Sequence, residues 1–236
     1  MQEHMQLDQV SGSVFDAAST TQKNQIGRKV TFTDGREFVY VATAADLAAG
    51  DVLVSTPNAQ AITAGQIATT HAIGSEVLTI TGAGVTLNEY AGGYLAVTSS
   101  TGVGYLYRVK SNTATASGVY TVTLKDALLV AVGTGTVGSL YVGLYDNVAQ
   151  GGVAGVPVGV AVVPTTAATA GATQYFWIQT KGLAVVKRSG NLSAGDKISP
   201  AASGAAAVTA AHGSPVIGNS MVAETSATHF LAKINV

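Results

Sequence analysis

Short apolar segments recur along most of this chain, and they restrict its fold more than any other feature. From Lys29 onward, runs rich in Val, Ile, Leu, Tyr and Thr alternate with clusters of Gly, Asn, Ser and Thr. A spacing of about 8–12 residues between such runs is typical of β-sandwiches and barrels. The predicted strands are Val77–Thr81, Tyr94–Thr98, Tyr105–Lys110, Val119–Leu124, Leu128–Val132, Leu140–Leu144, Val158–Val163, Tyr175–Gln179, Leu183–Val186, Met221–Ala223 and Phe230–Val236.

An Asp-Gly pair predicts the first hairpin. Val30 and Phe32 alternate with threonines before Asp34-Gly35, and an apolar run, Phe38–Val41, follows. Asp-Gly between alternating segments favours a two-residue turn in which both central residues have positive φ. We therefore expect antiparallel strands on either side of this pair.

Helix is expected to be scarce, because no long window places apolar residues at helical spacing against a polar face. The Ala-rich pieces 42–49 and 201–211 contain Gly, Ser or Thr and few large apolar anchors. The predicted class is all-β. We expect a sandwich or barrel-like domain with an additional β subdomain and an extended N-terminal arm.

The composition excludes several functional classes. Charged residues make up 11% of the chain, against about 25% in an average soluble domain. The net charge of −1 disfavours a basic nucleic-acid binder or a protein that binds anionic membranes. The absence of cysteine excludes disulfides, thiol catalysis and cysteine-based metal sites. No signal peptide or membrane helix is predicted, so synthesis in the cytoplasm is expected.

One internal repeat stands out. Leu47-Ala48-Ala49-Gly50-Asp51 matches Leu192-Ser193-Ala194-Gly195-Asp196, and an aliphatic residue follows two positions after each Asp. We expect Leu47 and Leu192 to be buried, Gly50 and Gly195 to allow positive φ, and Asp51 and Asp196 to bind local backbone amides. Two independent uses of a common turn are the alternative.

This repeat suggests the domain organisation. Residues 29–65 and 183–236 are predicted to be paired β units of one domain, with residues 66–182 as a central β subdomain. Residues 1–28 lack a regular period and are predicted to form the arm. Its apolar residues are candidates for binding a partner protein or for self-association, and a functionless tail is the alternative: Met5, Leu7, Val10, Val14 and Phe15.

No pattern indicates catalysis, a metal site or a cofactor. The segment Gly133–Gly138 fits G-x-G-x-x-G, but a strand-like segment follows instead of the required helix, so a hairpin turn is expected. The four histidines are isolated from one another. The chain is therefore predicted to be a binding or structural protein and not an enzyme.

Several segments resemble structural proteins encoded near the major capsid protein of tailed bacteriophages. The similar segments span roughly residues 33–236: Thr33–Tyr40 with Leu47–Asp51, Asn88–Leu95, Gly102–Val109, Pro157–Ala161 and Tyr175–Gly182. Their motifs are structural and not chemical.

The resemblance implies a capsid decoration, or cement, protein. Such a protein is β-rich, commonly a homotrimer, and clamps neighbouring major capsid subunits from outside the virion. It would bind the major capsid protein and itself, and neither nucleic acid nor membrane. A fibre or tail component is the alternative, and a carbohydrate-processing β enzyme is a weaker one because it would need a cleft with two carboxylates.

Overall fold

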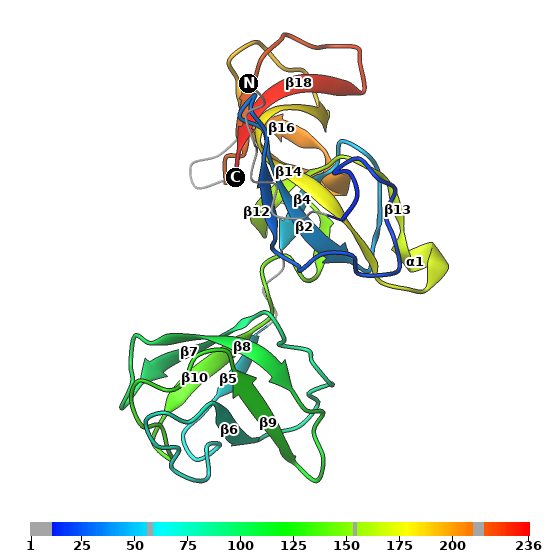
Figure 1. Cartoon of the computed structure of the whole chain (residues 1–236). Helices are drawn as coiled ribbons and strands as arrows, with labels where there is room; N and C mark the ends of the chain where they lie inside the picture. Colours follow the sequence, from blue (N-terminus) through cyan, green and yellow to red (C-terminus); the bar gives the residue numbers. More distant parts are fainter. Residues whose placement is uncertain (1–10, 56–58, 153–154, 210–214) are drawn as a thin grey trace, which may run out of the picture. The chain divides into compact units, whose positions relative to one another are not determined.

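A computed structural model describes residues 11–55, 59–152, 155–209 and 215–236 (Figure 1). These residues form eighteen β-strands, one short α-helix and one 3₁₀ turn, so the predicted all-β class is confirmed. All pairs of strands are antiparallel. Of the described residues, no helix is long and apolar enough to cross a membrane.

The chain divides into two compact units, which we call the outer unit (Met1–Thr56 with Leu144–Val236) and the inserted unit (Pro57–Gly143). The prediction of a central subdomain over residues 66–182 is therefore wrong at both boundaries. Residues 144–182 belong to the outer unit because their strands pair with β2 and β4. Ladders between distant segments decide such a boundary, and the local apolar pattern does not reveal them.

Most strands of the outer unit lie in one strongly curved sheet of order β11-β4-β12-β14-β18-β17-β15-β16, with β2 also pairing β14, and β1 pairing β2. The strands are β1 (Lys29–Thr31), β2 (Glu37–Thr43), β3 (Asp46–Leu47), β4 (Val52–Ser55), β11 (Val148–Gln150), β12 (Val156–Ala161), β13 (Thr165–Thr166), β14 (Gln174–Lys187), β15 (Lys197–Pro200), β16 (Ala206–Val208), β17 (Gly218–Ser220) and β18 (His229–Asn235). Helix α1 (Ala167–Ala170) and the 3₁₀ turn Ala202–Gly204 complete it.

The inserted unit is a six-stranded sheet of order β5-β10-β7-β8-β9-β6 curled around its own core. Its strands are β5 (Ala59–Ile62), β6 (Val77–Thr81), β7 (Tyr94–Ser99), β8 (Leu106–Asn112), β9 (Val119–Leu124) and β10 (Val137–Tyr141). The strand predicted at residues 128–132 is absent from this described region. Leu128 and Val132 are buried there, and only an isolated bridge joins Val132 to His71.

The predicted first hairpin is present as β1 and β2, but its turn differs from the predicted type. Phe32 N–H donates to the Arg36 carbonyl at 2.8 Å, which leaves a three-residue loop, and only Gly35 in it has positive φ. A type I turn followed by a left-handed glycine is the usual form of such a loop. The Asp34 side chain accepts a hydrogen bond from Arg36 N–H at 3.0 Å and so stabilises the loop locally.

The outer unit contains one β motif twice. In repeat 1, the strand order is β11-β4-β12-β14-β2; in repeat 2 it is β16-β15-β17-β18-β14. Strand β14 ends repeat 1 with its first half and begins repeat 2 with its second half. The inserted unit occupies the connection from β4 to β11, where repeat 2 has only the 3₁₀ turn.

The register of the two repeats also agrees. Ile178 lies opposite Val39 and Ala161, whereas Ala232 lies opposite Ala184 and Ser220. Two glycines make the same close approach in each copy. A Cβ at Gly159 would lie 2.6 Å from the Gln179 carbonyl oxygen, and one at Gly218 would lie 2.1 Å from that of Lys233. Both positions therefore require glycine for the same reason.

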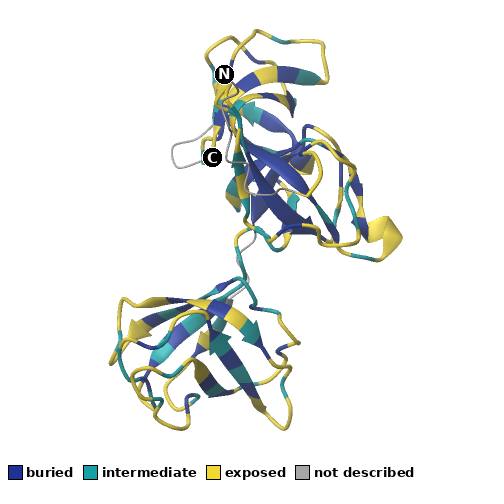
Figure 2. Ribbon diagram, viewed as in Figure 1, coloured by how far each residue is buried: buried dark blue, intermediate teal, exposed yellow. Residues whose placement is uncertain are grey.

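The two repeats have matching cores. Figure 2 shows buried positions along the central strands of the outer unit. The inward side chains of repeat 1 include Val41, Leu47, Leu53, Val158 and Phe176. Their register equivalents in repeat 2 are Val186, Leu192, Ile198, Ile217 and Phe230.

Residues 11–28 do not extend away from the fold as the predicted N-terminal arm. They lie on the outer unit, since Ser19 and Tyr175 exchange backbone hydrogen bonds and Lys23 N–H donates to the Tyr40 hydroxyl at 3.1 Å. Val14 is buried in a cluster with three aromatic residues of the sheet. The sequence alone did not reveal this because the aromatic partners come from β2 and β14.

Candidate interaction surfaces

The two L-x-A-G-D segments form the same turn. Leu47 and Leu192 are buried, and Gly50 and Gly195 have φ of +85° and +87°, as predicted. Asp51 Oδ2 accepts a hydrogen bond from Ala48 N–H at 2.8 Å. Asp196 Oδ2 accepts one from Ser193 N–H at 2.7 Å. The carboxylate thus closes the turn on its own backbone in each copy.

The agreement extends to the next strand. Gly50 N–H donates to the Ala161 carbonyl at 2.8 Å, and Ala161 N–H donates to the Asp51 carbonyl at 2.9 Å. Gly195, Ser220 and Asp196 repeat this pair of bonds at the same two distances. Because turn and register are both duplicated, the structure favours two related units over independent uses of a common turn.

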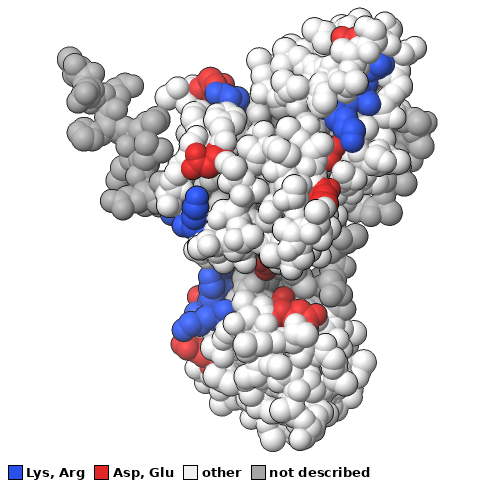
Figure 3. All heavy atoms as spheres, turned by 90° about the vertical axis from the view of Figure 1, so that its right-hand side faces the viewer, with Lys and Arg blue, Asp and Glu red and all other residues white. Residues whose placement is uncertain are grey.

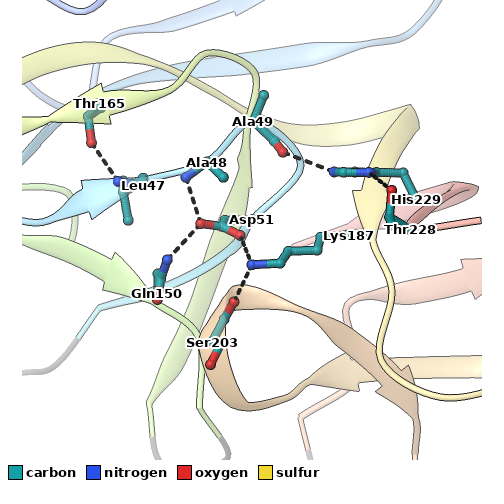
Figure 4. Close-up of polar contacts among 10 residues, drawn as sticks. All are labelled: Leu47, Ala48, Ala49, Asp51, Gln150, Thr165, Lys187, Ser203, Thr228 and His229. Atoms are coloured by element: carbon teal, nitrogen blue, oxygen red, sulfur yellow. Dashed lines mark hydrogen bonds and ion pairs between the residues drawn. The ribbon is translucent and has the colours of Figure 1, made fainter.

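Asp51 has partners that Asp196 lacks among the described residues. Its side chain is fully buried and accepts hydrogen bonds from Gln150 Nε2 at 2.9 Å and from Lys187 Nζ at 3.2 Å (Figure 4). Lys187 Nζ also donates to the Ser203 carbonyl at 2.8 Å. Lysine and serine both belong to repeat 2, so this network joins the two repeats. Asp196 is partly exposed.

His229 covers the same turn. Its Nε2 lies 3.2 Å from the Ala49 carbonyl oxygen and its Nδ1 lies 3.0 Å from the Thr228 hydroxyl (Figure 4). A carbonyl only accepts, so Nε2 donates and carries the proton. A Cβ at Gly50 would lie 2.6 Å from this ring. No local motif predicted that Gln150, Lys187 or His229 would meet this turn, since each comes from a different strand.

The arm residues separate into two groups. Val14 is buried, whereas Phe15 is 52% exposed and packs edge-to-face on Phe38 with ring centroids 5.7 Å apart. Met5, Leu7 and Val10 lie outside the described residues. Phe15 is therefore the one arm candidate that the structure presents at the surface of the described chain.

Two carboxylates have strongly displaced pKa values. Burial raises the pKa of Asp146 to about 6. Backbone N–H groups of Ala227 and Ser226 lower the pKa of Glu224 to about 2 because they stabilise the charged form. The Glu224 carboxylate thus binds the loop at residues 225–227. The Glu224 backbone also exchanges hydrogen bonds with Leu192, which places this loop beside the second turn.

The described residues include a small cavity and a glycine-rich turn. They contain no group of three His, Asp or Glu side chains that could hold a metal ion. A cavity beside Tyr40, Tyr175 and Trp177 measures about 10 Å³, room for about one water molecule. Residues 133–136 form a turn before β10, with Thr136 N–H donating to the Gly133 carbonyl at 2.8 Å. No strand directly precedes this turn, so the expected hairpin is not formed.

The inserted unit strongly exposes several large apolar side chains. Five of them are 61–69% exposed: Ile73, Leu87, Val103, Leu106 and Leu129. The unit has three acidic and three basic residues, Glu76, Glu89 and Asp126 with Arg108, Lys110 and Lys125. Figure 3 shows charged side chains in small groups separated by wide uncharged areas. Exposed apolar side chains on a charge-poor surface are suited to protein partners.

Comparisons with family models, with curated proteins and with solved structures found no match to this chain.

Proposed function

We propose that this chain is a structural virion protein that binds the outside of a tailed-phage capsid and bridges neighbouring major capsid subunits. The sequence resemblance over residues 33–236 carries this proposal. The exposed apolar side chains of the inserted unit support it, because a bridging protein needs surfaces that bind protein and not a pocket for a small molecule. We propose that it acts as a homotrimer and uses no cofactor.

The physical role follows from avidity. A shell filled with DNA is pushed outward, and each bridging copy adds contacts that must break before the shell opens. Many copies at symmetric positions turn modest individual affinities into a large combined effect. The chain is rich in Ala, Thr and Gly, which lose little side-chain conformational entropy when a surface is immobilised.

The test uses particles of the phage that encodes this chain. Heads lacking the protein would be mixed with purified protein and imaged by cryo-electron microscopy, with the heat stability of the heads measured in parallel. We expect added density on the outer surface at symmetric positions and a higher temperature of DNA release. Density on tails or fibres, or no binding to heads, would contradict the proposal.

Variants can identify the binding surface. Leu87→Asp and Leu129→Asp place a charge on the inserted unit, whereas Val208→Asp places one on the outer unit at an exposed site. If the inserted unit contacts the shell, the first two variants should bind heads at least about tenfold more weakly, a loss of about 1.4 kcal/mol. Mass measurement of the free and bound protein tests the trimer.

A further inference from the structure

The outer faces of the two repeats are equivalent in register but differ in their covering. In repeat 1, Phe38, Tyr40 and Trp177 are buried beneath Val14, with Val30 and Phe32 packed beside them. The equivalent side chains of repeat 2 remain exposed. They are Leu183 (50%), Val185 (61%) and Leu231 (38%).

These side chains form two rows across the sheet of repeat 2. One row is apolar: Leu231 lies opposite Val185, and Met221, 47% exposed, donates its N–H to the Leu231 carbonyl. The adjacent row carries charge and consists of Lys197, Asn219, Lys233 and Leu183. We call these two rows the repeat-2 face.

The charged row has no acidic partner in the part of the chain that the structure describes. The ion pairs found there involve neither Lys197 nor Lys233. At the corresponding positions repeat 1 has Val52 and Gln179, both buried. The repeat-2 face is thus suited to an extended segment that presents apolar side chains together with carboxylates.

We propose that the repeat-2 face binds residues 1–10 of the same chain. This segment contains Met5, Leu7 and Val10, and its charged residues are Glu3 and Asp8, with no Lys or Arg. Its carboxylates complement Lys197 and Lys233. A second copy of the repeat-2 face would instead place lysines opposite lysines, which is unfavourable across an interface.

The proposed occupant can reach this face. Phe15 contacts Phe38, which lies opposite Gln179 of β14. Leu183 of the repeat-2 face is four residues beyond Gln179 in the same strand. Four strand residues span about 13 Å, whereas ten extended residues span up to about 33 Å. A tethered segment also has an effective concentration in the millimolar range, which favours it over the same segment of another chain.

Because the chain has no cysteine, introduced thiols report on this contact without background. The test combines Leu7→Cys with Val185→Cys in the full chain under mild oxidation. We expect an intrachain disulfide, seen by mass and by a shifted monomer band on a non-reducing gel. Leu7→Cys with Leu129→Cys is the control pair and should stay reduced. A disulfide between chains would assign the face to a second copy and overturn the proposal, as would no disulfide.

A second measurement needs no crosslink. The thiol introduced by Leu7→Cys alone should react slowly with iodoacetamide, and adding Leu231→Asp or Lys233→Glu should raise its rate about tenfold, equivalent to about 1.4 kcal/mol of lost binding. Adding Leu129→Asp is the matched control. In the Lys233→Glu background, Asp8→Lys should restore slow reaction. Equal rates in all these variants would show that the face does not bind this segment.

Discussion

Repeat 1 and repeat 2 share strand order, register and turn chemistry, yet their surroundings differ. Repeat 1 has its outer face beneath residues 11–32 and its turn beneath Lys187 and His229 of repeat 2. In repeat 2 the equivalent turn is partly exposed and the equivalent face carries lysines. The comparison separates the residues that the motif needs to fold from the contacts that neighbouring segments add. Both copies use Leu, Gly and Asp to form the turn, whereas Asp51 is buried because other strands of the outer unit cover it.

The largest expected effect tests the buried leucine that both repeats share. Leu47→Ala and Leu192→Ala each remove a buried side chain at equivalent points, so each should lower the free energy of unfolding by about 2–5 kcal/mol. Urea unfolding followed by Trp177 fluorescence and circular dichroism would measure it. Ala194→Gly, at an exposed position of the second turn, is the control. A small cost at only one leucine would mean that the two sites are not equivalent in packing.

The second largest effect tests the hydrogen-bond network around Asp51, which differs between the two repeats. Asp51→Ala leaves Lys187 and Gln150 without their buried acceptor and should cost about 3 kcal/mol, near the lower end for a broken buried pair because Lys187 is partly exposed. Asp196→Ala loses mainly a turn hydrogen bond, about 1 kcal/mol. Urea midpoints of both variants give the comparison. Equal costs would show that the junction between the repeats adds nothing beyond the turn.

A pH effect is expected near β11, where Asp146 occupies the position of Gly204 in repeat 2. Burial raises the pKa of Asp146 from 3.8 to about 6, so the folded chain binds this proton more tightly than the unfolded chain. Stability should therefore fall as pH rises from about 4 to 6, by about 2 kcal/mol. Asp146→Asn should remove this slope and raise stability at pH 7. Unfolding midpoints at pH 4, 5, 6 and 7 would measure it, and an unchanged slope in the variant would contradict it.

The smallest effect concerns the covering of repeat 1. Val14→Ala removes two methyl groups from a buried cluster and should cost about 1.5 kcal/mol. Phe15→Ala should cost less, because that ring is half exposed. Thermal unfolding of the two variants distinguishes them. A larger loss from Phe15→Ala would mean that residues 11–28 are held to the sheet by the Phe15–Phe38 contact instead of by Val14.

The sequence by itself determined those features that depend on neighbouring residues. Alternating apolar runs specified strands, and the L-x-A-G-D segments specified two turns in which a carboxylate binds an amide three residues away. The hairpin at Asp34-Gly35 was located correctly, although its loop gained a third residue when Phe32 paired with Arg36. These interactions are local, so the residues that make them can be read together.

Only the tertiary structure decided which distant strands pair and what covers each face. It joined residues 144–182 to the outer unit and made the two apolar runs at residues 175–186 into one strand. It also buried Val14, although no local sequence pattern indicates that this residue is buried. It also brought Gln150 and Lys187 to Asp51 from strands far apart in the chain. Burial and ion pairing depend on which surfaces meet after the backbone has folded, and an apolar or charged residue in the sequence does not specify its partner.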